Sequence, residues 1–198
     1  MPQVVFPGRL TVIDTMAAAE KAIAVLSRCH LVGLDTETRP SFRKGVVNKT
    51  ALLQISSSES AYLFRLNIIG MPAFVCDFLA NPKIVKVGLS LKDDFSSLKR
   101  RASISPASYV ELQELAAEFG IREKGLQRMY ALLFGRRISK AQQLSNWEAD
   151  VLTEAQCQYA AIDAWSCIRI YKYLMKLKQN GNYRIIIRNA EESNTEER

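Results

Sequence analysis

Residues 30–38 read His-Leu-Val-Gly-Leu-Asp-Thr-Glu-Thr, an apolar run that ends in two acids. The run predicts a buried strand, with Asp35 and Glu37 near its end. Because side chains alternate across a strand, residues two positions apart point to the same face. Two carboxylates held this close repel each other, and one takes up a proton unless a cation neutralises them. The pattern fits a divalent-ion site, although an isolated Asp-x-Glu is more often a solvated strand end.

Short apolar runs and amphipathic segments alternate along the rest of the chain. The Ser-rich stretch 57–60 predicts a hairpin turn, and the polar residues 39–49 predict a loop. Early strands with short links favour antiparallel pairing, and later strands that alternate with helices favour parallel pairing. The predicted fold is therefore α/β, with a mixed sheet and helices on both faces. The predicted strands are 30–38, 50–56, 61–66, 84–89 and 109–110, and the predicted helices are 15–30, 71–80, 92–101, a helix that ends at 119, 124–134 and 153–178.

The composition is that of a globular protein. The 198 residues are 48% hydrophobic and 24% charged, which excludes a disordered chain, a collagen and a coiled coil. We expect a single domain over residues 1–187 and a mobile polar tail over 188–198. No apolar run approaches the roughly 20 residues of a membrane span, so no membrane contact is expected. The four cysteines form no Cys-x-x-Cys pair and nothing marks a secretory signal, so we expect reduced thiols and a cytoplasmic location.

The chain is basic, with a formal net charge of +7. This charge fits a polyanionic partner, or a soluble protein that is merely basic. Two basic clusters, 99–101 and Arg136–Arg137 with Lys140, either contact a nucleic-acid backbone or are simply solvated. We expect Trp147 and Trp165 to lie in the core.

Three further polar residues follow or lie on predicted elements. Asp94 comes directly after the strand 84–89, where an Asp often caps a helix. Tyr159 and Asp163 are four residues apart on the last long helix, so they share a face. Such a pair could hold a water molecule, but a core tyrosine with an aspartate at its rim is also common. The conjunction of these features with Asp35 and Glu37 is more informative than any one of them.

Together the motifs resemble the DEDD superfamily of 3′–5′ exonucleases in its tyrosine-bearing branch, and ribonuclease D and the Werner-syndrome exonuclease domain most closely. The segments that carry the resemblance are LDTET (34–38), KVGLSLKDDFSSL (86–98) and SNWEADVLTEAQCQYAAIDAWSCIRIY (145–171). The resemblance covers about residues 31–173. Its spacing from Gly88 to Leu98 selects Asp94 rather than Asp93 as the second-motif acid.

The resemblance implies a ribonuclease H-like fold and metal-dependent removal of nucleotides from a 3′ end, by a two-metal-ion mechanism. It implies two divalent ions, Mg²⁺ or Mn²⁺, and a nucleic acid with a free 3′ end as partner, with DNA or RNA left open. Tyr159 would position the attacking water. The four acids expected to bind the ions are Asp35, Glu37, Asp94 and Asp163.

Substrate contacts are expected just after the first motif. The resemblance places the backbone of Thr38 near the terminal 3′-hydroxyl. Phe42 and Lys44 lie in the following loop, where an aromatic ring beside cations suits a single-stranded end. An ordinary solvated loop, with Phe42 packed inward, explains the same residues.

Two other functions stay open. One is a nucleic-acid-binding module that keeps the fold without turnover, which a missing motif acid would favour; none is missing here. The other is a basic structural domain whose acids are incidental. The expected function is therefore a 3′–5′ exonuclease that hydrolyses phosphodiester bonds.

Overall fold

The computed structural model describes residues 1–181, so the predicted boundary at residue 187 and the tail 188–198 lie outside the described residues. Its strands are β1 (Arg9–Ile13), β2 (Leu31–Thr38), β3 (Thr50–Ser56), β4 (Ser60–Arg65), β5 (Val85–Gly88) and β6 (Tyr109–Glu111). Its helices are α1 (Met16–Leu26), α2 (Leu66–Ile69), α3 (Ala73–Ala80), α4 (Leu91–Lys99), α5 (Leu112–Glu118), α6 (Leu126–Phe134) and α7 (Glu154–Asn180).

The six strands form one mixed sheet in the order β1-β4-β3-β2-β5-β6. Strands β2, β3 and β4 pair antiparallel, whereas β5 and β6 pair parallel, as the sequence predicts. Strand β1 was not predicted, because its five residues lie at the sheet edge and gain their order from parallel pairing with β4. The single turn of α2 was also missed, since the hairpin strand runs directly into it.

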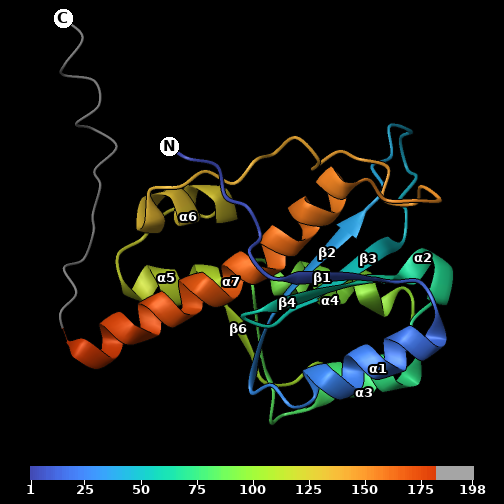
Figure 1. Ribbon diagram of the computed structural model, residues 1–198, viewed down its shortest axis with the longest axis horizontal. Helices are drawn as coiled ribbons and strands as arrows, with labels where there is room; N and C mark the ends of the chain where they lie inside the picture. The colour runs from blue at the N-terminus through green and yellow to red at the C-terminus, as the bar shows by residue number, and fades with distance from the viewer. Residues whose placement is uncertain (182–198) are drawn as a thin grey trace, which may run out of the picture.

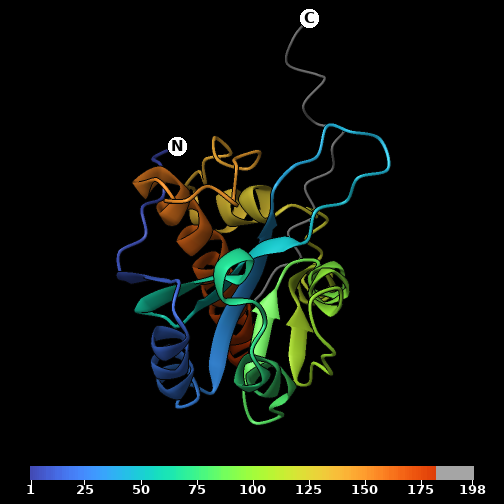
Figure 2. The ribbon, with the colours of Figure 1, turned by 90° about the vertical axis from the view of Figure 1, so that its right-hand side faces the viewer.

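Helices cover both faces of the sheet, as the sequence predicts (Figure 1). Helices α1, α3 and α4 pack on one face, and α5, α6 and α7 pack on the other. Figure 2 shows the sheet between the two helical layers, with β2 running through the middle of the molecule. The apolar faces of the helices and the alternating strand residues therefore close two cores around a single sheet.

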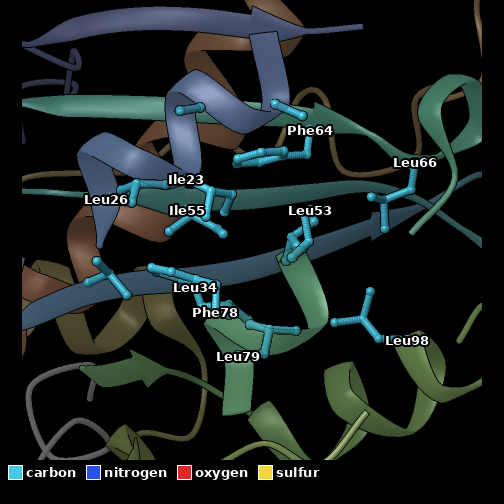
Figure 3. Packing of buried hydrophobic residues seen from close by; sticks show 14 of the residues in the cluster. Ile23, Leu26, Leu34, Leu53, Ile55, Phe64, Leu66, Phe78, Leu79 and Leu98 are labelled. Carbon is cyan, nitrogen blue, oxygen red and sulfur yellow. The ribbon is translucent and has the colours of Figure 1, made fainter. Parts of the chain in front are cut away.

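The core under α1 and α3 is built from side chains on the same face of the central strands. Figure 3 shows Leu34 of β2 beside Leu53 and Ile55 of β3, with Ile23 and Phe78 from the covering helices. All of these side chains are at most 8% exposed. Because each strand alternates its side chains, the odd-numbered residues of β2 face the opposite helix, α7.

Helix α7 lies against β2 at very short range. A Cβ added to Gly33 would lie 1.9 Å from the carbonyl oxygen of Ala164, so only glycine permits this approach. The helix begins at a capping box in which Thr153 and Gln156 exchange hydrogen bonds, and Gly181, in the left-handed conformation, caps its C-terminal end. The close packing brings the middle of α7 to the end of β2.

Several smaller predictions also bear on the fold. Trp147 and Trp165 are buried as expected, and all four cysteines are free thiols. Within residues 1–181, no helix combines the length and apolar character that a bilayer crossing requires.

Candidate active site

Three carboxylates meet where β2 ends beneath α7. Asp35 and Glu37 project from β2 toward α7, and Asp163 projects back from the helix. One carboxylate oxygen from each residue lies within 4.8 Å of the others. Asp163 is only 5% exposed, whereas Asp35 and Glu37 are half-buried. This spacing is that of ligands around one cation.

A fourth carboxylate reaches the cluster from the other face of the sheet. Strand β5 runs parallel to β2, so α4, which follows β5, begins beside the end of β2. Thr36 points away from α7, and its hydroxyl donates a hydrogen bond of 2.5 Å to Asp94 Oδ1. Asp93 is exposed instead. The structure therefore places Asp94, the acid selected from the motif spacing, beside Asp35.

The pKa values of all four acids are raised in the ion-free protein. Burial is the largest cause for each. The charge of Asp163 adds to the rise for Asp35, and the charge of Asp35 helps to raise the pKa of Glu37 to about 10 and of Asp94 to about 8. The pKa of Asp163 is raised to about 7, with a hydrogen bond from Tyr159 acting in the opposite direction. At neutral pH the mutual repulsion of these carboxylates is therefore relieved either by protonation or by a bound cation.

Tyr159 lies one helical turn before Asp163, and its hydroxyl is a hydrogen-bond partner of that carboxylate. Burial and the neighbouring charges of Asp163 and Glu37 raise the pKa of the phenol. The hydroxyl therefore stays protonated at neutral pH and can orient a water molecule, but it is a poor general base.

Two carboxylate oxygens in this cluster are buried and unpaired among the described residues. Among the described residues, Asp94 Oδ2 and Asp163 Oδ1 are buried without a hydrogen-bond partner. An unpaired buried oxygen of this kind is costly unless a proton or a cation satisfies it. Hard divalent cations take carboxylate oxygens as ligands. The donor set thus fits the divalent ions that the motifs imply.

An open pocket of about 340 Å³ exposes this cluster to solvent. Its walls include residues that lie outside the three motifs. Lys140 and Gln143 come from the segment between α6 and α7, and Lys140 forms no ion pair within residues 1–181. Lys140 belongs to the basic cluster with Arg136 and Arg137, for which the sequence leaves contact with a nucleic-acid backbone or simple solvation open. The remaining wall residues are Leu89, Gly125, Leu126, Gln127 and Cys167, beside Asp35, Thr36, Glu37, Tyr159 and Asp163.

The predicted substrate-binding residues do not line the pocket. Thr38 is the last residue of β2, directly after Glu37. Phe42 and Lys44 lie in the loop 39–49, which projects beyond the sheet (Figure 2). Phe42 is 90% exposed, so the alternative in which it packs inward is wrong. Their contacts with substrate stay predictions.

The basic cluster 99–101 has a structural contact that the sequence did not predict. The guanidinium of Arg100 donates to the carbonyl oxygens of Val47 and Asn48. Arg101 Nε donates to the carbonyl oxygen of Thr50. Two of the three cations therefore anchor the end of the loop 39–49.

Comparison with known proteins agrees with this geometry. A family model described as a 3′–5′ exonuclease matches residues 10–179. The chain belongs to the 3′–5′ exonuclease family. This membership confirms the resemblance drawn from the motifs and makes the chain a nuclease of the hydrolase class.

Curated relatives of this exonuclease are found in plants, animals and bacteria. A 3′–5′ exonuclease of Arabidopsis thaliana is 33% identical over 193 residues, covering 89% of this chain and 67% of that protein. The bifunctional exonuclease and helicase WRN of Mus musculus is 30% identical over 89% of this chain, but the match spans only 13% of that protein. Ribonuclease D of Haemophilus influenzae is 30% identical over 77% of this chain and 40% of its own length.

Solved structures share the fold. Ribonuclease D of Escherichia coli matches with a TM-score of 0.77 and 24% identity, over 87% of this exonuclease chain and 46% of its own. The Nibbler EXO domain of Aedes aegypti matches with a TM-score of 0.79 and 19% identity, over 89% and 92% of the two chains. The predicted ribonuclease H-like mixed sheet is thus confirmed.

Proposed function

We propose that this chain removes nucleotides from the 3′ end of a nucleic acid by hydrolysis assisted by two divalent ions, Mg²⁺ or Mn²⁺. The observation that carries the proposal is the convergence of Asp35, Glu37 and Asp163 within 4.8 Å, with Asp94 joined to them through Thr36. The two buried carboxylate oxygens without partners, one on Asp163 and one on Asp94, support it, because each would be satisfied by a bound cation.

Each acid has a distinct place in this proposal. Asp35, Glu37 and Asp163 would hold one ion. Asp35 would share the second ion with Asp94, which reaches the cluster from the opposite face of the sheet. When bound, such ions neutralise the charge that develops on the phosphate during displacement. The raised pKa values of the acids fit this role, since the carboxylates need positive charge to stay ionised together.

Tyr159 would orient the attacking water. Its hydroxyl already lies against Asp163, at the wall of the pocket, and its raised pKa keeps the proton in place. A protonated phenol fixes the position of a water by hydrogen bonding without taking its proton.

The substrate would approach across a mixed polar and apolar surface. Lys140 would meet a phosphate, since it is the only cation in the pocket wall formed by the described residues. Thr38 would contact the terminal nucleotide through its backbone, and Phe42 with Lys44 would contact bases and phosphates further along the strand. Support for a nucleic-acid substrate comes from a similar structure of Trypanosoma brucei ribonuclease D, which was solved with RNA U12.

The proposal is tested by following labelled single-stranded, recessed-end and blunt DNA, and matched RNA, with Mg²⁺ or Mn²⁺. We expect shortening from the 3′ end that a chelator stops. Asp35→Asn and Asp163→Asn should lower the rate at least about 100-fold while the protein stays folded.

Asp94 and Asp93 provide a matched pair of variants. Asp94→Asn should lose activity, whereas Asp93→Asn, which changes an exposed neighbour on the same helix turn, should keep it. If no substrate is shortened with either metal ion, the proposal is wrong. Salt-sensitive binding without cleavage would then favour the non-catalytic binding module.

A further inference from the structure

Glu111 is a buried carboxylate near the acid cluster that the proposed chemistry does not use. It ends β6 and is 8% exposed. Its Oε1 accepts a hydrogen bond of 2.7 Å from the backbone N–H of Ser90, and its Oε2 accepts one of 2.8 Å from the N–H of Leu91. Because both carboxylate oxygens accept hydrogen bonds from the backbone, Glu111 fixes the backbone at Ser90 and Leu91 and is not free to bind a metal ion.

The two N–H groups belong to the start of α4. Parallel pairing of β5 with β6 sets Glu111 opposite Gly88, two residues before Ser90. Ser90 is the N-cap residue, but its side chain makes no capping hydrogen bond, and its backbone is left-handed with φ 64°. A residue other than glycine adopts this conformation only when its surroundings hold it there. The carboxylate of Glu111 does so, and its charge suits the positive end of the helix dipole.

The same peptide groups connect Glu111 to Asp94. The carbonyl oxygen of Ser90 accepts hydrogen bonds from the N–H groups of Asp93 and Asp94, at 2.9 and 3.3 Å. Ser90 is therefore held by Glu111 on its N–H side and bonded to Asp94 on its carbonyl side. Two successive hydrogen bonds lead from the Glu111 carboxylate to the backbone of the acid that reaches Asp35.

We infer that Glu111 is a positioning residue that fixes Asp94 in reach of the second divalent ion. This inference rests on the proposed function, because it assigns Glu111 a role at the same ion site. Thr36 fixes the carboxylate of Asp94 from β2, and Glu111 fixes its backbone from β6. Asp94 is thereby oriented from both of the strands that flank β5.

Glu111→Gln is the sharpest variant. It keeps the shape of the side chain but replaces one acceptor oxygen with an NH₂ group, which cannot accept from a backbone N–H. The matched control is Glu114→Gln. Glu114 also contacts the start of α4, but its carboxylate pairs with the exposed side chain of Lys92 and not with the backbone N–H groups that Glu111 binds.

The primary measurement is Mn²⁺ binding, followed by electron paramagnetic resonance of the free ion with a nucleoside 5′-monophosphate present. We expect wild type and Glu114→Gln to bind two ions alike. In Glu111→Gln the weaker ion should bind roughly 10- to 100-fold less tightly, with the tighter ion unchanged. In nuclease assays kcat should fall at limiting Mn²⁺ and recover at high Mn²⁺, while KM for the nucleic acid stays constant.

If Glu111→Gln does not fold, Glu111→Asp is measured in its place. It keeps the charge on a shorter side chain, and we expect a smaller loss of affinity for the same ion. A folded Glu111 variant with the wild-type Mn²⁺ titration would overturn the inference, and so would an equal loss for both ions. Wild-type protein that binds no Mn²⁺ would instead contradict the proposed function itself, and with it the ion that Asp94 is positioned to meet.

Discussion

The hydroxyl of Thr36 donates a hydrogen bond to Asp94, a residue 58 positions further along the chain. Thr36 stands between Asp35 and Glu37 in the first motif, but it points to the opposite face of β2. The end of this strand therefore carries acids toward α7 and a hydroxyl toward α4. The acid cluster forms around the strand end, with Asp163 arriving on one side and Asp94 on the other.

Thr36→Val tests this connection. The variant keeps the shape of the side chain but removes the donor, so Asp94 loses the group that aims its carboxylate. We expect kcat to fall roughly 10- to 100-fold and the Mn²⁺ concentration for half-maximal rate to rise. Steady-state kinetics at several Mn²⁺ concentrations measure both. Thr36→Ser keeps a hydroxyl and should restore most of the rate; if it behaves like Thr36→Val, the hydrogen bond is not the cause.

The raised pKa values of the acids predict how the stability of the protein depends on pH when a chelator has removed metal ions. Folding raises the pKa of Asp163 to about 7 and of Asp94 to about 8, so the native state binds more protons than the unfolded chain above about pH 4. The stabilising contribution is fully present below about pH 4 and is lost progressively until the pH passes the folded pKa values, about 7 for Asp163 and about 8 for Asp94. Thermal unfolding should show a melting temperature roughly 2–8 °C lower at pH 8.5 than at pH 6.

Bound Mn²⁺ should restore the stability that is lost at high pH, because the ions neutralise the carboxylates as protons do at low pH. Saturating Mn²⁺ at pH 8.5 should raise the melting temperature by several degrees, about 2–3 kcal/mol of stability at 100 times the dissociation constant. Asp163→Asn should be less sensitive to pH and to Mn²⁺, whereas Asp93→Asn should match wild type. A melting temperature independent of both pH and Mn²⁺ would contradict the account.

Gly33→Ala tests the close approach of β2 and α7. The added Cβ would lie 1.9 Å from the Ala164 carbonyl oxygen, so the helix must move away from the strand. We expect a loss of about 1–3 kcal/mol in the free energy of unfolding, and lower activity because Asp163 moves from Asp35. Urea denaturation measures the loss. At Gly125 an added Cβ meets nothing within 4 Å, so Gly125→Ala should leave stability nearly unchanged.

Arg101→Leu tests whether the residues that follow α4 anchor the loop 39–49. The variant removes the donor to the Thr50 carbonyl oxygen, so the loop should open more often. We expect trypsin to cleave after Arg43 or Lys44 several-fold faster, as mapped by mass spectrometry, with Mn²⁺ binding unchanged. Lys99→Leu is the control, because Lys99 lies two residues before Arg101 and belongs to the same basic cluster, but the loop contacts come from Arg100 and Arg101. Equal cleavage in both variants would show that Arg101 is not the anchor.

Much of the sheet could be predicted because its strands are short apolar runs bounded by polar turns. The Ser-rich turn 57–60 and the alternation of later strands with helices predicted both the antiparallel and the parallel pairs. Strand β1 was not predicted because Arg9–Ile13 is an edge strand whose order depends on a partner about 50 residues away. Periodicity within five residues does not carry that information.

The motif acids were predicted because carboxylates at strand ends and on one helix face have recognisable spacing. Thr36 and Glu111 were not assigned to the site from the sequence, for a shared reason. Each acts through a contact with a residue distant in sequence, and a lone Thr or Glu has no local signature. The role of Arg101 was equally unpredictable, since its charge fits nucleic-acid contact or simple solvation but its Nε donates to the protein backbone.

The central claim is that four acids from β2, α4 and α7 hold two divalent ions, and crystals soaked in Mn²⁺ test it most directly through anomalous scattering. The account predicts one peak against Asp35, Glu37 and Asp163 and a second against Asp35 and Asp94, about 4 Å apart. Saturating Mn²⁺ with no anomalous density between Asp35 and Asp163 would contradict it.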